Sequence, residues 1–176
     1  EFPPECREDL LERLCAYQEG RGVSLLTVLE TRPEHFLAAE ESGELDKIAP
    51  LLSRLRAAVN FGFESADPFI RNVIYLKEMA ETDFLGAIQK AKRRRLDPGA
   101  FVFAGGYALT TSECLESTRH SVQFLENNGV FVNIMVPNLQ CFSLPDLLFQ
   151  LNYMELPEPY FCLDMIDLMR HFRPHR

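Results

Sequence analysis

The chain has 176 residues, of which 47% are apolar and 25% charged. This is ordinary globular composition, sufficient for one sizeable core, and a single domain over residues 1–176 is expected. Its 18 basic and 26 acidic residues give a net charge of −8, which opposes non-specific attraction to nucleic-acid phosphates or anionic membranes. No apolar run approaches the roughly 20 residues of a membrane span, and no secretory leader is present. We therefore expect a soluble, cytoplasmic protein.

The five cysteines are an odd number at wide spacings: Cys6, Cys15, Cys114, Cys141 and Cys162. This pattern indicates neither a disulfide framework nor a paired zinc knuckle, and buried reduced thiols are the plainer interpretation. The four histidines show no metal-ligand spacing. No metal-binding residue is predicted.

The first third of the chain alternates helical and strand patterns. An amphipathic helix is expected over residues 3–20, and the apolar run 23–30 predicts a strand covered on both faces. A helix begins at Pro33 and breaks at Gly43. A second helical stripe follows over 44–55 despite Pro50, and 57–63 is the next strand.

The same alternation continues to the end of the chain. A helical region starts at Asp67, and the next helix covers 82–95, with Thr82 or Asp83 as its cap. Strands over 99–106 and 130–137 enclose a capped helix over 110–129 that Gly129 closes. Further helices are expected near 144–154 and 160–172. Strands that alternate with helices need crossover connections. We therefore predict an α/β fold with a mostly parallel sheet of about four strands, as an open sheet or an incomplete TIM-like barrel.

Polar residues follow each predicted strand. In parallel α/β sheets, ligands bind outside the carboxyl ends of the strands. The strand ends carry Glu30, Thr31 and Arg32; Glu64 and Ser65; Gly105, Gly106 and Tyr107; and Asn138 and Gln140. Together they suit a polar small molecule with amino, carboxylate and hydroxyl groups. The alternative is structural, with Glu30, Glu64 and Asp67 serving only as helix caps.

Three stretches in order, "LETRPEHF", "NFGFESADPFIRNVIYLKEM" and "VPNLQCFSLPDLLFQ", carry a family likeness over nearly the whole chain. The chain resembles the radical S-adenosylmethionine superfamily, in the Fe-S oxidoreductase branch related to tRNA-modifying and archaeosine-forming enzymes. The matching motifs are Glu-Thr-Arg-Pro-Glu at 30–34, Gly-x-Glu-Ser at 62–65 before a basic helix, and Asn-x-Gln at 138–140. Tyr75 and Glu78 depart from the family pattern.

The resemblance implies a partial barrel in which a [4Fe-4S] cluster cleaves S-adenosylmethionine to a 5′-deoxyadenosyl radical. The family binds that cluster through Cys-x3-Cys-x2-Cys, and no cysteine spacing here matches it. The chain then corresponds to the carboxyl-terminal part of the barrel without the cluster-binding strands. On this interpretation it binds no cluster and is inert alone, and no catalytic residue is assigned.

The resemblance also implies roles for eight cofactor-binding residues. Glu64 and Ser65 would lie near the ribose or amino group of S-adenosylmethionine, and Arg71 or Lys77 would pair with its carboxylate. Glu30 and Arg32 would border cofactor or substrate. Asn138 and Gln140 would lie on the adenine or substrate side. The substrate itself is not predicted.

Two alternatives stay open at this point. The basic run 90–95, "KAKRRR", would provide RNA phosphate contacts, but its place at a helix end favours a solvated face. A nucleic-acid partner is therefore disfavoured, though not excluded. The second alternative is a non-enzymatic partial-barrel subunit or partner-binding module. Its exposed edge would associate with a second copy or with a missing N-terminal segment.

Overall fold

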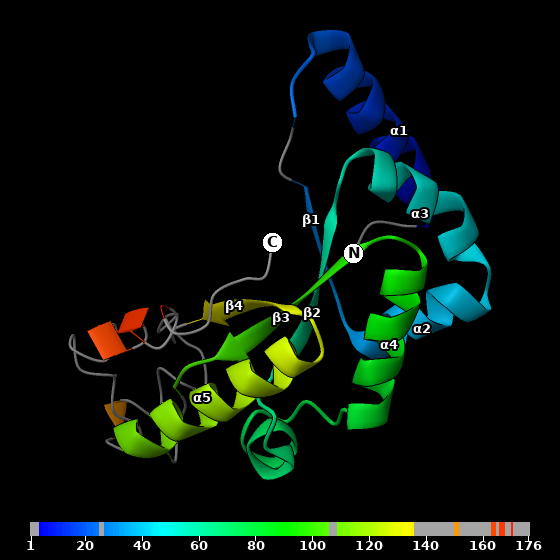
Figure 1. Cartoon of the computed structure of the whole chain (residues 1–176). Helices are drawn as coiled ribbons and strands as arrows, with labels where there is room; N and C mark the ends of the chain where they lie inside the picture. The colour runs from blue at the N-terminus through cyan, green and yellow to red at the C-terminus, as the bar shows by residue number, and fades with distance from the viewer. Residues whose placement is uncertain are drawn as a thin grey trace. The chain divides into compact units, whose positions relative to one another are not determined.

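The computed structural model describes residues 4–24, 27–105, 109–135, 150–151, 163–164, 166–167 and 170. Its helices are α1 (Pro4–Arg21), α2 (Pro33–Glu41), α3 (Glu44–Arg54), a π-helix η1 (Ile70–Ile74), α4 (Glu81–Arg93) and α5 (Thr111–Asn127). Its strands are β1 (Val28–Thr31), β2 (Ala58–Glu64), β3 (Asp97–Phe103) and β4 (Phe131–Met135). Helices and strands alternate along the chain (Figure 1).

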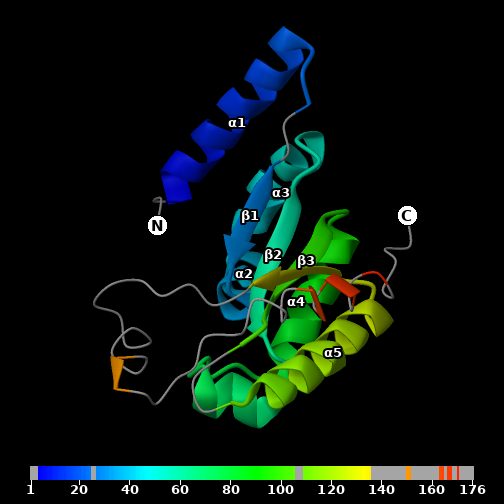
Figure 2. The ribbon, with the colours of Figure 1, turned by 90° about the vertical axis from the view of Figure 1, so that its left-hand side faces the viewer.

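The four strands form one sheet in the order β1-β2-β3-β4. β1 and β2 pair in parallel, with Val28 opposite Ala58 and Thr31 opposite Phe61, and Figure 2 shows the two strands side by side. The strands do not close into a barrel within the residues that the structure describes. The predicted α/β class with a parallel four-stranded sheet is therefore confirmed.

The chain divides into two compact units. Unit 1 comprises Glu1–Gly62 and Ala80–Gly99, and unit 2 comprises Phe63–Met79 and Ala100–Arg176. The single domain expected over residues 1–176 stays a prediction. No helix in the described part of the chain is long and apolar enough to cross a membrane.

Unit 1 has an aromatic core between its helices and β2. The ring of Phe61 meets Phe36 of α2 edge-on at 5.4 Å and Phe84 of α4 at 6.3 Å between centroids. Such edge-to-face pairs stabilise a core beyond the area they bury. Because successive strand residues point to opposite faces, the side chains of Ala58 and Asn60 lie on the sheet face away from these helices.

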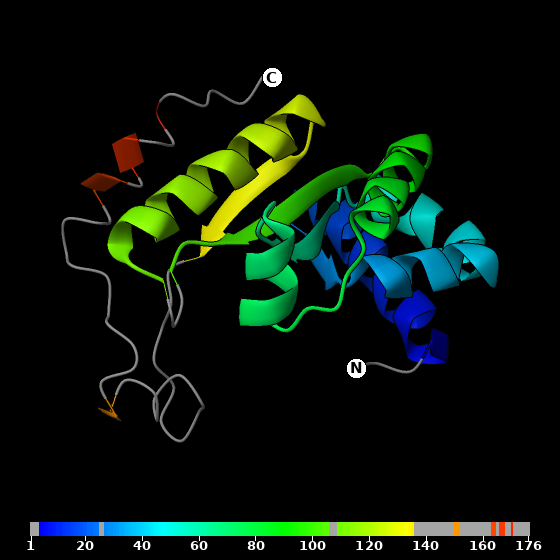
Figure 3. The same cartoon turned by 90° about the horizontal axis from the view of Figure 1, so that it is seen from below.

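In unit 2, α5 packs along β4 (Figure 3). Its N-terminus is a capping box in which Thr110 accepts from the Glu113 backbone and the Glu113 carboxylate accepts from Thr110. Inside the unit, Phe63 stacks on Phe124 with centroids 5.3 Å apart. The predicted capped helix that ends at Gly129 is thus confirmed.

Three helices end in the same way. Each of α3, α4 and α5 is followed by a residue with positive φ and then by a buried apolar residue. The residues with positive φ are Arg56, Arg95 and Gly129, respectively. The next backbone N–H reaches back to the last turn, as from Leu96 to the Ala91 carbonyl at 3.0 Å. This is the Schellman motif, in which glycine is the usual residue.

The structure corrects several predicted boundaries. The first strand is Val28–Thr31 and not 23–30, and its residues alternate between exposed and half-buried because it lies at the sheet edge. On α1, Leu10, which the amphipathic pattern of residues 3–20 places on the apolar face with Leu11 and Leu14, is 41% exposed. The cap of α4 is Ala80, so Thr82 and Asp83 lie in the first turn. The helices expected at 144–154 and 160–172 fall largely outside the described residues.

Candidate ligand-binding site at the end of β2

Strand β2 ends in a tight turn centred on Glu64. The Ser65 backbone N–H donates to the Phe63 carbonyl at 2.9 Å, and Glu64 has a φ of +67°. A three-residue turn with positive φ is the rare and strained form of the γ-turn. For a residue with a Cβ, such backbone costs roughly 1–3 kcal/mol, and in proteins this kind of strain clusters at functional sites.

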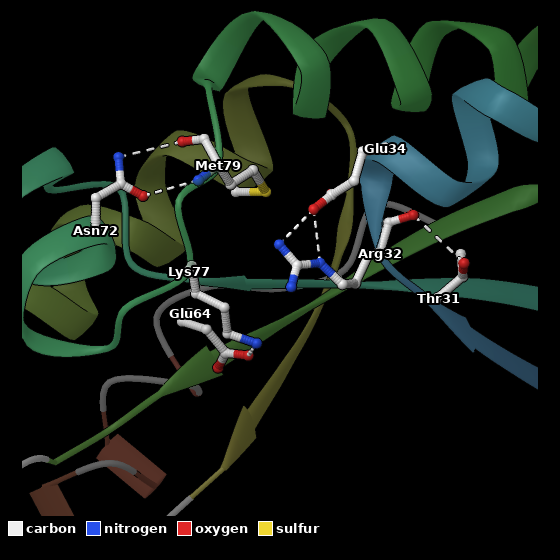
Figure 4. Close-up of polar contacts among 7 residues, drawn as sticks. All are labelled: Thr31, Arg32, Glu34, Glu64, Asn72, Lys77 and Met79. Carbon is white, nitrogen blue, oxygen red and sulfur yellow. Dashed lines mark hydrogen bonds and ion pairs between the residues drawn. The ribbon is translucent and has the colours of Figure 1, made fainter. Parts of the chain in front are cut away.

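The Glu64 carboxylate forms an ion pair with Lys77. Lys77 Nζ lies 2.7 Å from Glu64 Oε1, as Figure 4 shows. The Lys77 side chain is 30% exposed and that of Glu64 is 13% exposed. Both charges are therefore sheltered from most of the solvent but remain accessible to it, so a ligand with opposite charges could compete for them.

Lys77 is held by a short segment with unusual backbone. The residues on either side of it, Leu76 and Glu78, have φ of +52° and +49°. Asn72 fixes the far end of the segment, since its Oδ1 accepts from Met79 N at 3.0 Å and its Nδ2 donates to Met79 O at 3.2 Å (Figure 4). The backbone around the ammonium group is thus positioned by hydrogen bonds as well as by packing.

Ser65, which follows Glu64 in the chain, and Arg71 are both buried. Arg71 donates from its terminal guanidinium nitrogen to the Ser65 carbonyl at 2.9 Å, and its guanidinium lies 5.4 Å from the centre of the Phe63 ring. The Ser65 and Ser117 hydroxyls are 3.0 Å apart. These contacts support the γ-turn from within unit 2.

Asp67, and not Glu64, caps the helical segment that follows. Its Oδ1 accepts from the backbone N–H groups of Phe69 at 2.8 Å and Ile70 at 3.1 Å. The capping alternative is therefore correct for Asp67 and wrong for Glu64. The Glu64 carboxylate is directed to Lys77 instead.

The two predicted site residues of unit 1 lie near the end of β1. Glu30 is exposed and pairs in register with Asn60 of β2. Arg32 precedes α2 without a side-chain cap, and its Nε donates to Glu34 Oε1 at 2.6 Å (Figure 4). Glu30 therefore does not cap α2, and the Arg32 guanidinium is engaged by a carboxylate within its own unit.

The structure thus brings four predicted residues of unit 2 together and places two in unit 1. Glu64, Ser65, Arg71 and Lys77 are linked by the contacts above, whereas Glu30 and Arg32 belong to the other unit. The remaining two, Asn138 and Gln140, lie outside the described residues. Their assignments stay predictions.

Sequence analysis missed three residues. Asn72 and Tyr75 support the site from unit 2, the latter through a 2.5 Å hydrogen bond from its hydroxyl to the Gly105 carbonyl. Asn60 is 4% exposed, and among the described residues its Oδ1 has no hydrogen-bond partner. The sequence does contain a signal for Asn60. A side-chain amide inside the apolar run 57–63 is expected to be buried, and a buried amide without a hydrogen-bond partner lowers the stability of the fold.

No group of three histidine, cysteine or acidic side chains suited to a metal ion occurs among the described residues. Cys15 in unit 1 and Cys114 in unit 2 are buried and reduced. Cys15 donates to the Leu51 carbonyl at 3.6 Å. These two thiols are therefore core residues, as the sequence predicts for them.

No family model and no curated protein matches the chain. Among solved structures, it is similar to the archaeal Methanocaldococcus infernus Elp3 with an N-terminal deletion of residues 1–46, with a TM-score of 0.62 at 16% identity. The match covers 85% of this chain but 33% of that protein, so the chain spans about a third of its length. The comparison shows that the two proteins share a fold over the matched part.

Proposed function

We propose that this chain is the S-adenosylmethionine-binding part of a radical S-adenosylmethionine enzyme. The observation that carries the proposal is the Glu64–Lys77 ion pair at the carboxyl end of β2, held between strained backbone segments. The distant fold relation to that superfamily supports the same interpretation. The substrate on which such an enzyme acts is not assigned.

Charge complementarity makes the methionyl end of S-adenosylmethionine a suitable ligand. Its ammonium group would bind the Glu64 carboxylate, and its carboxylate would bind the Lys77 ammonium. The pair keeps 30% and 13% of its two side chains exposed, so the ligand's charges can reach both groups and replace each as the other's partner. The charge-assisted hydrogen bonds that replace it are worth roughly 1.5–3 kcal/mol each.

Backbone strain at Glu64 supports a functional role over a purely structural one. Glycine at this position would avoid the cost of a positive φ, yet the chain has a glutamate there. In the proposal, the turn holds the carboxylate where the ligand's ammonium binds.

The other predicted residues have secondary roles in the proposal. Ser65 and Arg71 position the turn, because both are buried and bonded within it. Glu30 and Arg32 would border the cofactor or the substrate, and Asn138 with Gln140 would lie on the adenine or substrate side.

A [4Fe-4S] cluster supplies the electron that cleaves S-adenosylmethionine in this superfamily. Such a cluster needs three thiolates at one place, and the described residues do not bring three cysteines together. The described residues therefore do not fit the cluster, and the proposal is confined to S-adenosylmethionine binding.

The test is calorimetric titration of the chain with S-adenosylmethionine and with 5′-methylthioadenosine, which lacks the amino-acid group. Glu64→Gln and Lys77→Met should each weaken S-adenosylmethionine binding by roughly 1.5–3 kcal/mol and leave methylthioadenosine binding unchanged. Glu116→Gln is the matched control, because it removes an exposed ion pair with Arg119 in the same unit. Equal affinities in all three variants, or no binding to the parent chain, would contradict the proposal.

A second candidate function is a non-enzymatic module that binds another copy of the chain. Three large apolar side chains in and around η1 of unit 2, those of Phe69, Val73 and Leu76, are more than half exposed. Exposed apolar groups of this kind favour association. Light scattering tests this candidate function. A parent chain that is a dimer, and that Leu76→Ser converts to a monomer, would support the module. A monomeric parent chain would rule the module out.

A further inference from the structure

Two serines of α5 bond to the segment of chain that follows β2. Ser121 is buried, and its hydroxyl donates to the Ser117 carbonyl at 2.7 Å and accepts from the backbone N–H of Ala66 at 2.9 Å. The Ser117 hydroxyl lies 3.0 Å from that of Ser65. A buried N–H without an acceptor lowers stability, so Ser121 supplies the bond that this backbone needs. The contacts attach α5 to the two residues that follow Glu64.

The same helix also holds the residue before Glu64. The ring of Phe63 stacks on that of Phe124, with centroids 5.3 Å apart and planes inclined by 7°. Ser117, Ser121 and Phe124 follow one another at spacings of four and three residues, so their side chains lie on one face of α5. One face of a single helix therefore fixes the chain on both sides of Glu64.

This support matters because the turn at Glu64 is strained. Its φ of +67° is unfavourable for a residue with a Cβ, and strained backbone persists only where the surrounding structure fixes it. Without the contacts from α5, the turn can relax toward a negative φ. The Glu64 carboxylate would then leave its place beside Lys77, whose Nζ lies 2.7 Å from Glu64 Oε1.

We propose that Ser117 and Ser121 are positioning residues of the ligand site at the end of β2. Neither touches the ligand. They fix the backbone after Glu64, so that the carboxylate faces the ligand's ammonium group. The inference rests on the proposed function, because the role that it assigns to the two serines is in S-adenosylmethionine binding. It extends the site to α5, a helix in which the sequence predicts no site residue.

The test is calorimetric titration of the full chain with S-adenosylmethionine and with 5′-methylthioadenosine. Ser121→Ala should weaken S-adenosylmethionine binding about tenfold, as the loss of one charge-assisted hydrogen bond does, and should leave 5′-methylthioadenosine binding unchanged. Thr118→Val is the matched control. It removes another buried hydroxyl of α5, one that donates within the helix to the Cys114 carbonyl at 2.7 Å, and should leave both affinities unchanged.

Two further variants separate positioning from a general effect on the fold. In the Glu64→Gln background, Ser121→Ala should have no additional effect on S-adenosylmethionine affinity, because it acts through a carboxylate that is already absent. Ser117→Ala keeps the bond to Ala66 and loses only the pairing with the Ser65 hydroxyl. It should weaken binding about threefold, and it provides the measurement if Ser121→Ala does not fold.

Three results would overturn the inference. If both serine variants bind S-adenosylmethionine as tightly as Thr118→Val, while Lys77→Met binds it weakly, the proposed function stands and this inference fails. A further loss of affinity when Ser121→Ala is added to Glu64→Gln would show that the serine does not act through the carboxylate. A parent chain that does not bind S-adenosylmethionine would contradict the proposed function and this inference together.

Discussion

Lys77 Nζ lies 2.7 Å from Glu64 Oε1, and both residues are in or beside backbone with positive φ. Glu64 is the centre of the γ-turn, and Lys77 stands between Leu76 and Glu78, which are also left-handed. The ion pair thus joins two strained segments of unit 2. Their strain and their charges can be tested separately.

Glu64→Gly should be more stable than Glu64→Ala by about 1 kcal/mol. Both variants lose the ion pair, but only glycine relieves the cost of a positive φ, which is about 1–2 kcal/mol before glycine's greater chain entropy is subtracted. Urea unfolding of the two variants measures the difference. A more stable alanine variant would show that the turn at Glu64 carries no strain.

Tyr75→Phe should lower the free energy of unfolding by about 0.5–1.5 kcal/mol, because it removes the hydroxyl that bonds the Gly105 carbonyl. The ring would still meet Phe103 edge-on at 5.4 Å between centroids. Tyr75→Leu removes that contact as well and should cost a further 0.5–1.5 kcal/mol or so. Equal unfolding free energies for the two variants would exclude a contribution from the ring pair.

Arg95→Gly should stabilise unit 1 by roughly 0.5–1 kcal/mol. Arg95 has a φ of +59° at the end of α4, where glycine is preferred. Lys92→Gly in the same helix is the control and should destabilise by about 1 kcal/mol, because Lys92 is inside the helix. Chemical denaturation measures both, and a destabilised Arg95→Gly would point to contacts made by the arginine side chain.

The capping box of α5 should make stability depend on pH. The Thr110 backbone N–H, together with its hydroxyl, holds the pKa of Glu113 below its ordinary value of 4.5. A lowered folded-state pKa means that this contribution is fully present above the unfolded-state value and is lost as the pH falls through the folded-state value. The difference in unfolding free energy between the parent chain and Glu113→Gln should therefore be largest near neutral pH.

That difference should shrink toward zero as the solution becomes more acidic than pH 4.5, which unfolding curves at several pH values would show. Glu116→Gln, on the same helix but outside the capping box, controls for the loss of one negative charge. A pH-independent difference for Glu113→Gln would mean that the charged carboxylate does not stabilise the cap.

The sequence by itself determined the α/β class, most element positions and the capped helix after Thr110, because these depend on local patterns. Helical and strand periodicity, a Thr-x-x-Glu cap and a closing Gly129 are each read within a few residues. Through the family resemblance, it also predicted Glu64 and Lys77 as cofactor-binding residues, and these assignments stay predictions. It did not show that they pair with each other.

Only the tertiary structure decided the details on which the proposed binding site depends. Glu64 and Lys77 are 13 positions apart, and their 2.7 Å contact exists because Asn72 holds Met79 and the chain turns back at positive φ. Likewise, Val28–Thr31 is a half-exposed strand because it lies at the sheet edge, and Asn60 Oδ1 has no hydrogen-bond partner among the described residues. Local patterns cannot specify these features, since strand neighbours and side-chain partners are chosen by contacts between distant residues.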